Sequence, residues 1–168
     1  MPEIFARAYD PRMAARNGKP SSATDKMIQI VSDLTHLELQ FSGRYWDISF
    51  SATTRDGAFG ARFKANKYLH LTQRWKSLAI EVTEQQENTI FYNACLLTYL
   101  QYDIIGVNSL ITKLDIIKPD PNKTWCNRVV SQALKTGLPI KGPNEVTPDE
   151  SFAQIERYLK EKERANAA

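Results

Sequence analysis

The chain has 168 residues and a net charge of +3, from 22 basic and 19 acidic residues. This predicts one globular domain, argues against nucleic acid as a partner and, with no apolar run near the roughly 18 residues of a membrane span, excludes a spanning helix. Two histidines and two distant cysteines give neither a disulfide framework nor a zinc-ligand spacing, so no metal or other cofactor is expected.

The first 24 residues hold prolines, a glycine and the run PSSAT, which predict an irregular N-terminal arm. They lack the apolar stretch of a secretion signal, so we expect a cytoplasmic location for the protein as synthesised. Thr24 or Asp25 suits the N-cap of a helix with apolar residues at helical spacing. The pattern predicts a folded domain that begins at residue 25.

From Leu34 the apolar period becomes two, which predicts a strand over residues 35–41 with His36 and Glu38 on its polar side. Residues 44–53 alternate again and predict the second strand of a hairpin. Further along the chain, sequence patterns predict a turn at 55–57 and strands at 60–65 and 76–82.

Thr83 to Gln86 form a capping box, which predicts a helix over residues 84–100. Cys95 falls on the apolar face of this helix, so we expect it to be buried and inert. An apolar and helical pattern follows over residues 102–117, and two prolines then make residues 118–123 a loop.

Residues 124–136 are helical by pattern, and Gly137 fits the position just after the last turn. A capped helix from Thr147 and a charged tail at 156–168 end the chain. Four short strands flanked by helices predict an α+β domain over residues 25–155 with a small antiparallel sheet packed against helices.

Cys126 is the candidate nucleophile of the chain. With Thr124 as N-cap it would occupy the second helical position, where free amide groups and the helix dipole favour an anion and lower a thiol pKa. The preceding loop would leave the sulfur near the surface. The alternative is a small buried hydrophobe, the usual state of a lone free cysteine.

His36 is the candidate base, because it lies in the middle of a strand on its polar side. The other histidine, His70, belongs to a loop with no polar pattern around it. Glu38, two residues on from His36 and on the same side, could reach the imidazole and orient it. Cysteine, histidine and a polar orienter form a nucleophilic triad.

The hairpin register offers two other orienters. A two-residue turn would place Ser49 opposite His36, but it would also set Glu38 against Asp47, and opposed like charges are destabilising. A four-residue loop avoids that pair and places Ser51 opposite His36. We prefer the four-residue loop. Ser51 and Glu38 are therefore the preferred candidates for the third member of the triad, and Ser49 is the alternative.

Five motifs occur in an order that resembles the circularly permuted NlpC-like papain-fold cysteine hydrolases, most closely the small members common in bacteriophages and bacteria. They are THLELQF, FSATTRDGAFGARFK, QYDIIG, TWCNRVVSQAL and VTPDESF, and the resemblance covers roughly residues 25–152. It implies a permuted papain-like arrangement of the sheet and helices, a phage-encoded protein and incorporation in a virion as one destination.

The resemblance also implies roles for individual residues. Cys126 resembles the nucleophile, His36 the general base, Glu38 the acidic residue two places later and Ser51 the third catalytic residue. Four further residues match positions that bind substrate or shape the site: Tyr102, Asp103, Trp125 and Asn127. The activity implied is cofactor-free hydrolysis or transfer at an amide, thioester or ester, with peptidoglycan peptides favoured over other peptides and acyl groups as substrates.

One departure leaves two functions open. The family reads Trp-Phe-Cys-Ser-Glu around the nucleophile, whereas this chain reads Trp125-Cys126-Asn127-Arg128. The new cation would lower the thiol pKa further in an active cysteine hydrolase. The lost acid instead suits a catalytically silent structural or binding component of a phage particle, with other virion proteins as partners.

Overall fold

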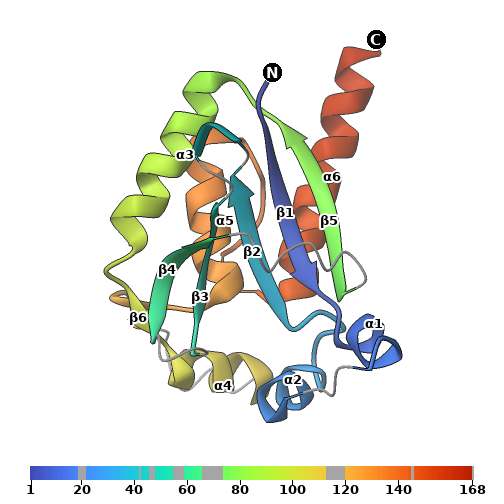
Figure 1. Cartoon of the computed structure of the whole chain (residues 1–168), viewed down its shortest axis with the longest axis vertical. Coiled ribbons are helices and arrows are strands. Elements are labelled where there is room, and N and C mark those ends of the chain that lie inside the picture. Colours follow the sequence, from blue (N-terminus) through green and yellow to red (C-terminus); the bar gives the residue numbers. More distant parts are fainter. Residues whose placement is uncertain are drawn as a thin grey trace.

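The structure, a computed structural model, describes residues 1–18, 22–41, 43–45, 48–54, 59–65, 74–112, 120–144 and 146–167. Within these ranges the fold is α+β, with a sheet of seven strands in the order β5-β1-β2-β3-β4-β6-β7 (Figure 1). Neighbouring strands are antiparallel except β6 and β7. The strands are β1 Glu3–Tyr9, β2 His36–Phe41, β3 Ile48–Thr53, β4 Gly60–Ala65, β5 Trp75–Glu81, β6 Gln101–Tyr102 and β7 Lys123–Thr124.

The described helices fall into two groups (Figure 1). Three of them, α3, α5 and α6, cover one face of the sheet, and α1, α2 and α4 lie at one end of it, below the strands in the view. Among the helices of the described ranges, none is long and apolar enough to cross a membrane. Their bounds are α1 Pro11–Arg16, α2 Ala23–Ile28, α3 Glu84–Leu97, α4 Ile104–Thr112, α5 Cys126–Gly137 and α6 Pro148–Asn166.

The sequence predicted an irregular arm at the N-terminus, and this prediction is wrong. Residues Glu3–Tyr9 form β1, an interior strand of the sheet. β1 pairs along its length with β2 on one side and β5 on the other. Ile4, Ala6 and Ala8 alternate into the core. The period-two signal was weak because two of these positions are alanine and Arg7, on the other side, is buried as well.

Several predicted helix boundaries need correction. α2 is capped by Ser22, whose side chain forms a capping box with Asp25, and not by Thr24 or Asp25. α6 continues to Asn166, so residues 156–166 of the predicted tail belong to this helix. The predicted strands at 60–65 and 76–82, the capping box that opens α3 and the helix start at Thr147 are confirmed to within a residue.

Gly137 is the last residue of α5 and does not follow the helix. A Cβ atom at this position would lie 2.7 Å from Cγ1 of Ile90 on α3. Glycine is therefore required here for close contact between α3 and α5, and not for a left-handed helix end.

Cys95 is exposed, so the prediction that it is a core residue is wrong. The buried stripe of α3 consists of Glu87, Ile90 and Ala94. The polar Glu87 hid the true position of this stripe in the sequence pattern. Cys95, one residue beyond Ala94, falls outside it.

The core lies between the sheet and α3, α5 and α6. Leu37, Leu39 and Phe41 of β2 point into it, and the facing residues of α5 include Val129 and Leu134, all fully or almost fully buried. The opposite side of β2 carries His36 and the other polar residues. This packing brings the first turn of α5 to the start of β2, where the candidate site lies.

Candidate active site

β2 and β3 pair at Leu39–Phe50 and Gln40–Ser49, with residues 42–47 connecting them. The connection is longer than the two- and four-residue loops predicted, and the register lies two residues from the preferred one. Within this connection the ring of Tyr45 stacks on Phe91 of α3, with centroids 3.9 Å apart. A shift of two leaves every side chain on its predicted face. The turn predicted at 55–57, Asp47 and His70 lie outside the described residues.

The ladder between β2 and β3 opens at the end that holds His36. There the Ser51 hydroxyl donates a 2.6 Å hydrogen bond to the Leu37 carbonyl. The backbone of Leu37 also lowers the pKa of the Cys126 thiol. Buried backbone groups need partners, and the Ser51 hydroxyl serves the Leu37 carbonyl where a neighbouring strand would otherwise pair.

Cys126 is the first residue of α5, one position earlier than predicted, because Thr124 lies in β7 and Trp125 is the N-cap. It is only 3% exposed, so the expectation of a sulfur near the surface is wrong. Burial raises the pKa of the thiol, but the charge and hydrogen bond of His36, with the backbones of Leu37 and Asn127, lower it below the ordinary value.

His36 faces Cys126, as the sequence predicted. Burial lowers the pKa of the imidazole, but the charge and hydrogen bond of Cys126, followed by those of Glu38, raise it to about 9. The opposite shifts of the two partners favour the thiolate–imidazolium form of the pair. On its other side the imidazole meets the Trp75 ring edge-on, with centroids 6.1 Å apart.

Glu38 is the candidate orienter that contacts the imidazole. Its Oε1 lies 3.3 Å from Nε2 of His36 and 2.9 Å from Nζ of Lys64. Burial raises the pKa of this carboxyl, but His36 and Lys64 together lower it to about 2. Ser51 braces the backbone of β2, and Ser49 pairs with Gln40, so the structure brings only Glu38 of these candidates to the ring.

Asn127 and Arg128, which depart from the family pattern, have structural contacts. The Asn127 side chain donates hydrogen bonds to the Val146 carbonyl and, at 3.4 Å, to the Ser151 hydroxyl. Arg128 Nη1 donates to the carbonyls of Asp120 and Lys123 at 3.0 and 2.8 Å. The expected effect of the Arg128 charge on the thiol is not among the causes of its lowered pKa.

The Tyr-Asp-x-x-Gly element holds the segment that leads to the cysteine. Asp103 accepts hydrogen bonds from the amides of Gly106, at 2.8 Å, and Asp120, at 3.2 Å, and its own amide donates to the Thr124 carbonyl. A Cβ on Gly106 would lie 3.0 Å from the buried ring of Trp125. Tyr102 pairs with Thr124 between β6 and β7.

Sequence reasoning missed the cations around Glu38. Lys64 binds the carboxylate, and Arg7, directly opposite Glu38 on β1, contributes a favourable charge. The alternating pattern of β4 predicts the side of the strand on which Lys64 lies, but not the residue that it contacts. Arg7 was missed because β1 was not recognised as a strand.

Within the described ranges, no group of three or more His, Cys, Asp or Glu side chains could hold a metal ion. When the chain is compared with protein-family models, curated proteins and solved structures, none of the three comparisons gives a match.

Proposed function

We propose that the protein is a cysteine hydrolase that cleaves an amide, thioester or ester bond through a covalent thioester. Cys126 is the nucleophile, His36 the general base and acid, and Glu38 the residue that orients and charges the imidazole. The observation that carries the proposal is the placement of His36 beside the buried sulfur of Cys126, where each group shifts the pKa of the other and the two shifts are opposite in direction.

In the first step the Cys126 thiolate attacks the carbonyl carbon and a carbon–sulfur bond forms. The imidazolium of His36 then gives its proton to the leaving nitrogen, oxygen or sulfur as its bond to the carbonyl carbon breaks. In the second step His36 takes a proton from water, whose oxygen attacks the thioester. The acid product leaves, and the thiolate and imidazolium are restored.

The start of α5 supports stabilisation of the tetrahedral intermediate. The first amides of a helix have no intrahelical partner, and no side chain caps α5. The amide of Cys126 therefore suits an oxyanion hole, where the helix dipole adds further stabilisation.

The substrate class rests on the resemblance of the motifs. Peptidoglycan peptides are favoured, and other peptides and acyl groups are the alternatives. A phage-encoded enzyme that acts from the virion or in the host cytoplasm would meet such peptides. The chemistry proposed uses no metal and no organic cofactor.

A second candidate is a catalytically silent structural or binding component of a phage particle, with other virion proteins as partners. The low exposure of Cys126 favours it, because a sulfur that is covered in every state cannot reach a substrate carbonyl. In that case the thiolate–imidazolium pair would serve only to join α5 to β2.

Intact-protein mass spectrometry with a substrate panel separates the two candidates. Peptidoglycan fragments, peptides and acyl esters are incubated with the wild type, with Cys126→Ala and, as matched control, with Cys95→Ala. An active enzyme forms an acyl adduct and product with the wild type and the control only. Equal silence of all three proteins, with Cys126 alkylated no faster than Cys95, would leave the structural role.

A further inference from the structure

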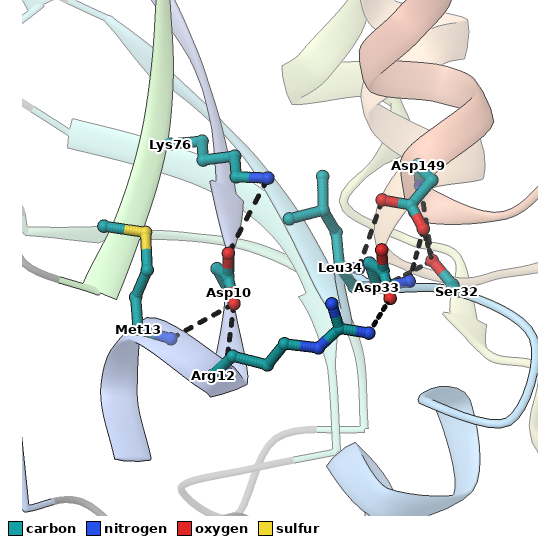
Figure 2. A network of polar contacts seen from close by, with 8 residues as sticks. All are labelled: Asp10, Arg12, Met13, Ser32, Asp33, Leu34, Lys76 and Asp149. Carbon is teal, nitrogen blue, oxygen red and sulfur yellow. Dashed lines mark hydrogen bonds and ion pairs between the residues drawn. The ribbon is translucent and has the colours of Figure 1, made fainter. Parts of the chain in front are cut away.

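The segment that opens α6 contacts the turn that leads into β2. Figure 2 shows the Asp149 carboxylate facing the backbone of residues 32–34. It accepts hydrogen bonds from the amides of Asp33 and, at 3.2 Å, Leu34. The Ser32 hydroxyl lies 2.9 Å from the carboxylate and 2.6 Å from the Leu34 carbonyl, and it accepts a hydrogen bond from the Asp149 amide at 3.4 Å. Hydrogen bonds to a charged acceptor are stronger than neutral ones, so one carboxylate holds three successive residues.

These three residues lie immediately before the candidate base. Thr35, the residue between them and His36, is itself held, since its hydroxyl donates a 2.8 Å bond to buried Asp25 and its amide bonds the Tyr9 carbonyl. On the outer side, Asp33 pairs with Arg12 of α1 (Figure 2). The path of the chain into His36 is therefore set residue by residue.

The same segment also binds the helix that carries the candidate nucleophile. The Val146 carbonyl and the Ser151 hydroxyl accept the hydrogen bonds of Asn127, the residue next to Cys126. The Ser151 hydroxyl lies 3.4 Å from that of Ser131, one turn further along α5. Residues 146–151 thus touch the chain just before the base and just after the nucleophile.

We infer that Asp149 is a positioning residue, which sets the placement of His36 against Cys126 by joining the entry of β2 to the segment that holds the start of α5. The inference rests on the proposed function, whose chemistry needs the imidazole and the sulfur in hydrogen-bond contact. A displacement of about 1 Å in such a pair costs on the order of 100-fold in rate. The ionised carboxylate is compatible with its place in the first turn of α6, where the dipole favours an anion.

Glu150, the next residue, provides a matched control. It is also an acid of the first turn of α6, but its contacts are with the amide and hydroxyl of Thr147, the N-cap of its own helix. Glu150→Ala therefore removes the same charge and weakens the same helix, and leaves the turn before His36 and the side chain of Asn127 untouched.

The test measures the pH dependence of Cys126 alkylation by iodoacetamide, and the titration of His36 by NMR, in a Cys95→Ser background. We expect Asp149→Ala to lower the His36 pKa toward its ordinary value and raise that of Cys126. If the Cys126 pKa rises by one, alkylation at a fixed pH below that pKa becomes about tenfold slower. Glu150→Ala should leave both titrations as in the reference protein, although both variants unfold at lower urea concentration.

Asp149→Asn keeps the side-chain volume and one acceptor oxygen, so it replaces Asp149→Ala in the test if that variant does not fold. We expect it to shift the pKa values of His36 and Cys126 in the same directions, but by less. Unchanged titrations in a folded Asp149 variant, or equal shifts in Glu150→Ala, overturn the inference while the proposed function stands. An ordinary Cys126 pKa in the reference protein instead contradicts the thiolate–imidazolium pair itself. Neither readout requires a substrate.

Discussion

The thiol pKa values of the two cysteines differ in the opposite direction to the one that their exposure alone would suggest. Cys95 is exposed on α3, yet the partial burial of its sulfur raises the pKa of the thiol. Cys126 is buried at the start of α5, yet its pKa is lowered. A thiol is activated by the charges and donors that touch it, and these are easier to arrange in a buried site.

The helix positions of the two residues reinforce this difference. Cys126 is the first residue of its helix, where amide groups and the positive end of the dipole favour a thiolate. Cys95 lies in the last turn of α3, where free carbonyls disfavour one, and its own carbonyl accepts bonds from Thr98. Each cysteine is therefore the natural control for the other.

The largest expected effect is the loss of activity in Cys126→Ala. Without the sulfur no thioester forms, so hydrolysis of any substrate found by the panel should fall by at least about 10⁴-fold. Cys95→Ala should retain the wild-type rate. The measurement is steady-state hydrolysis with circular dichroism as a fold check, since Cys126→Ala also removes the partner of Leu37 and His36. A folded Cys126→Ala protein with substantial activity would place the nucleophile elsewhere.

His36→Ala should be nearly as severe and should also make Cys126 more like Cys95. The imidazolium supplies the main charge and hydrogen bond that lower the Cys126 pKa, so its removal leaves burial to raise that pKa. The double variant should be little worse than either single one, because nucleophile and base act as a unit. Alkylation rates between pH 5 and pH 10 test the first point, and kcat/KM of the three variants tests the second. If the loss of kcat/KM in the double variant equals the product of the two single losses, Cys126 and His36 do not act as a unit.

Glu38→Gln and Ser51→Ala should have milder effects on activity, with Glu38→Gln the larger. Glu38 touches the imidazole and helps to hold its proton, whereas the Ser51 hydroxyl donates to the Leu37 carbonyl. We expect a loss in kcat/KM of roughly 10²-fold for Glu38→Gln, at the lower end of the range for positioned acid–base groups, and of less than about tenfold for Ser51→Ala. A pH–rate profile supplies the second readout, since Glu38→Gln should move its alkaline limb to lower pH and Ser51→Ala should not. The reverse order would make Ser51 the third member.

The stability of the protein should fall in acid because of Glu38. Its carboxyl has a pKa of about 2 in the folded protein and 4.5 as its ordinary value, so the unfolded chain binds the extra proton first. The contribution is complete above pH 4.5 and is lost as pH falls through 2, by about 3 kcal/mol in all. Urea unfolding should show that wild type and Glu38→Gln differ less in free energy of unfolding at pH 2.5 than at pH 6. A constant difference would mean that Glu38 is not ionised through its contacts with His36 and Lys64.

The sequence predicted the partners of Cys126 better than it predicted its surroundings. The period of two on residues 35–41 placed His36 and Glu38 on one side, and helical spacing placed Cys126 in the first turn of its helix. These are local properties of a strand and a helix. The α+β class followed in the same way from counting strands and helices.

The exposure of the cysteines depended instead on tertiary packing. Cys126 is buried where the first turn of α5 meets His36 and Leu37 at the start of β2, and the place of β2 in the sheet depends on its pairing with β1, which has no strong local signal. Cys95 is exposed because Glu87, a charged residue by sequence, takes a place in the buried stripe of α3. Lys64 and Arg7 could not be assigned to Glu38 before the register of the strands was known.

The smallest expected effect is that of Cys95→Ala on stability. The sequence placed Cys95 in the core, where the change would cost about 1 kcal/mol as a small cavity. An exposed side chain leaves no cavity, so the free energy of unfolding should change by less than about 0.5 kcal/mol, and the better helix propensity of alanine partly offsets any loss. Urea unfolding measures this directly, and alkylation of the wild type should modify Cys95 slowly below its raised pKa and faster above it. A loss near 1 kcal/mol, or alkylation of Cys95 at pH 6 as fast as that of Cys126, would remove the contrast between the two cysteines.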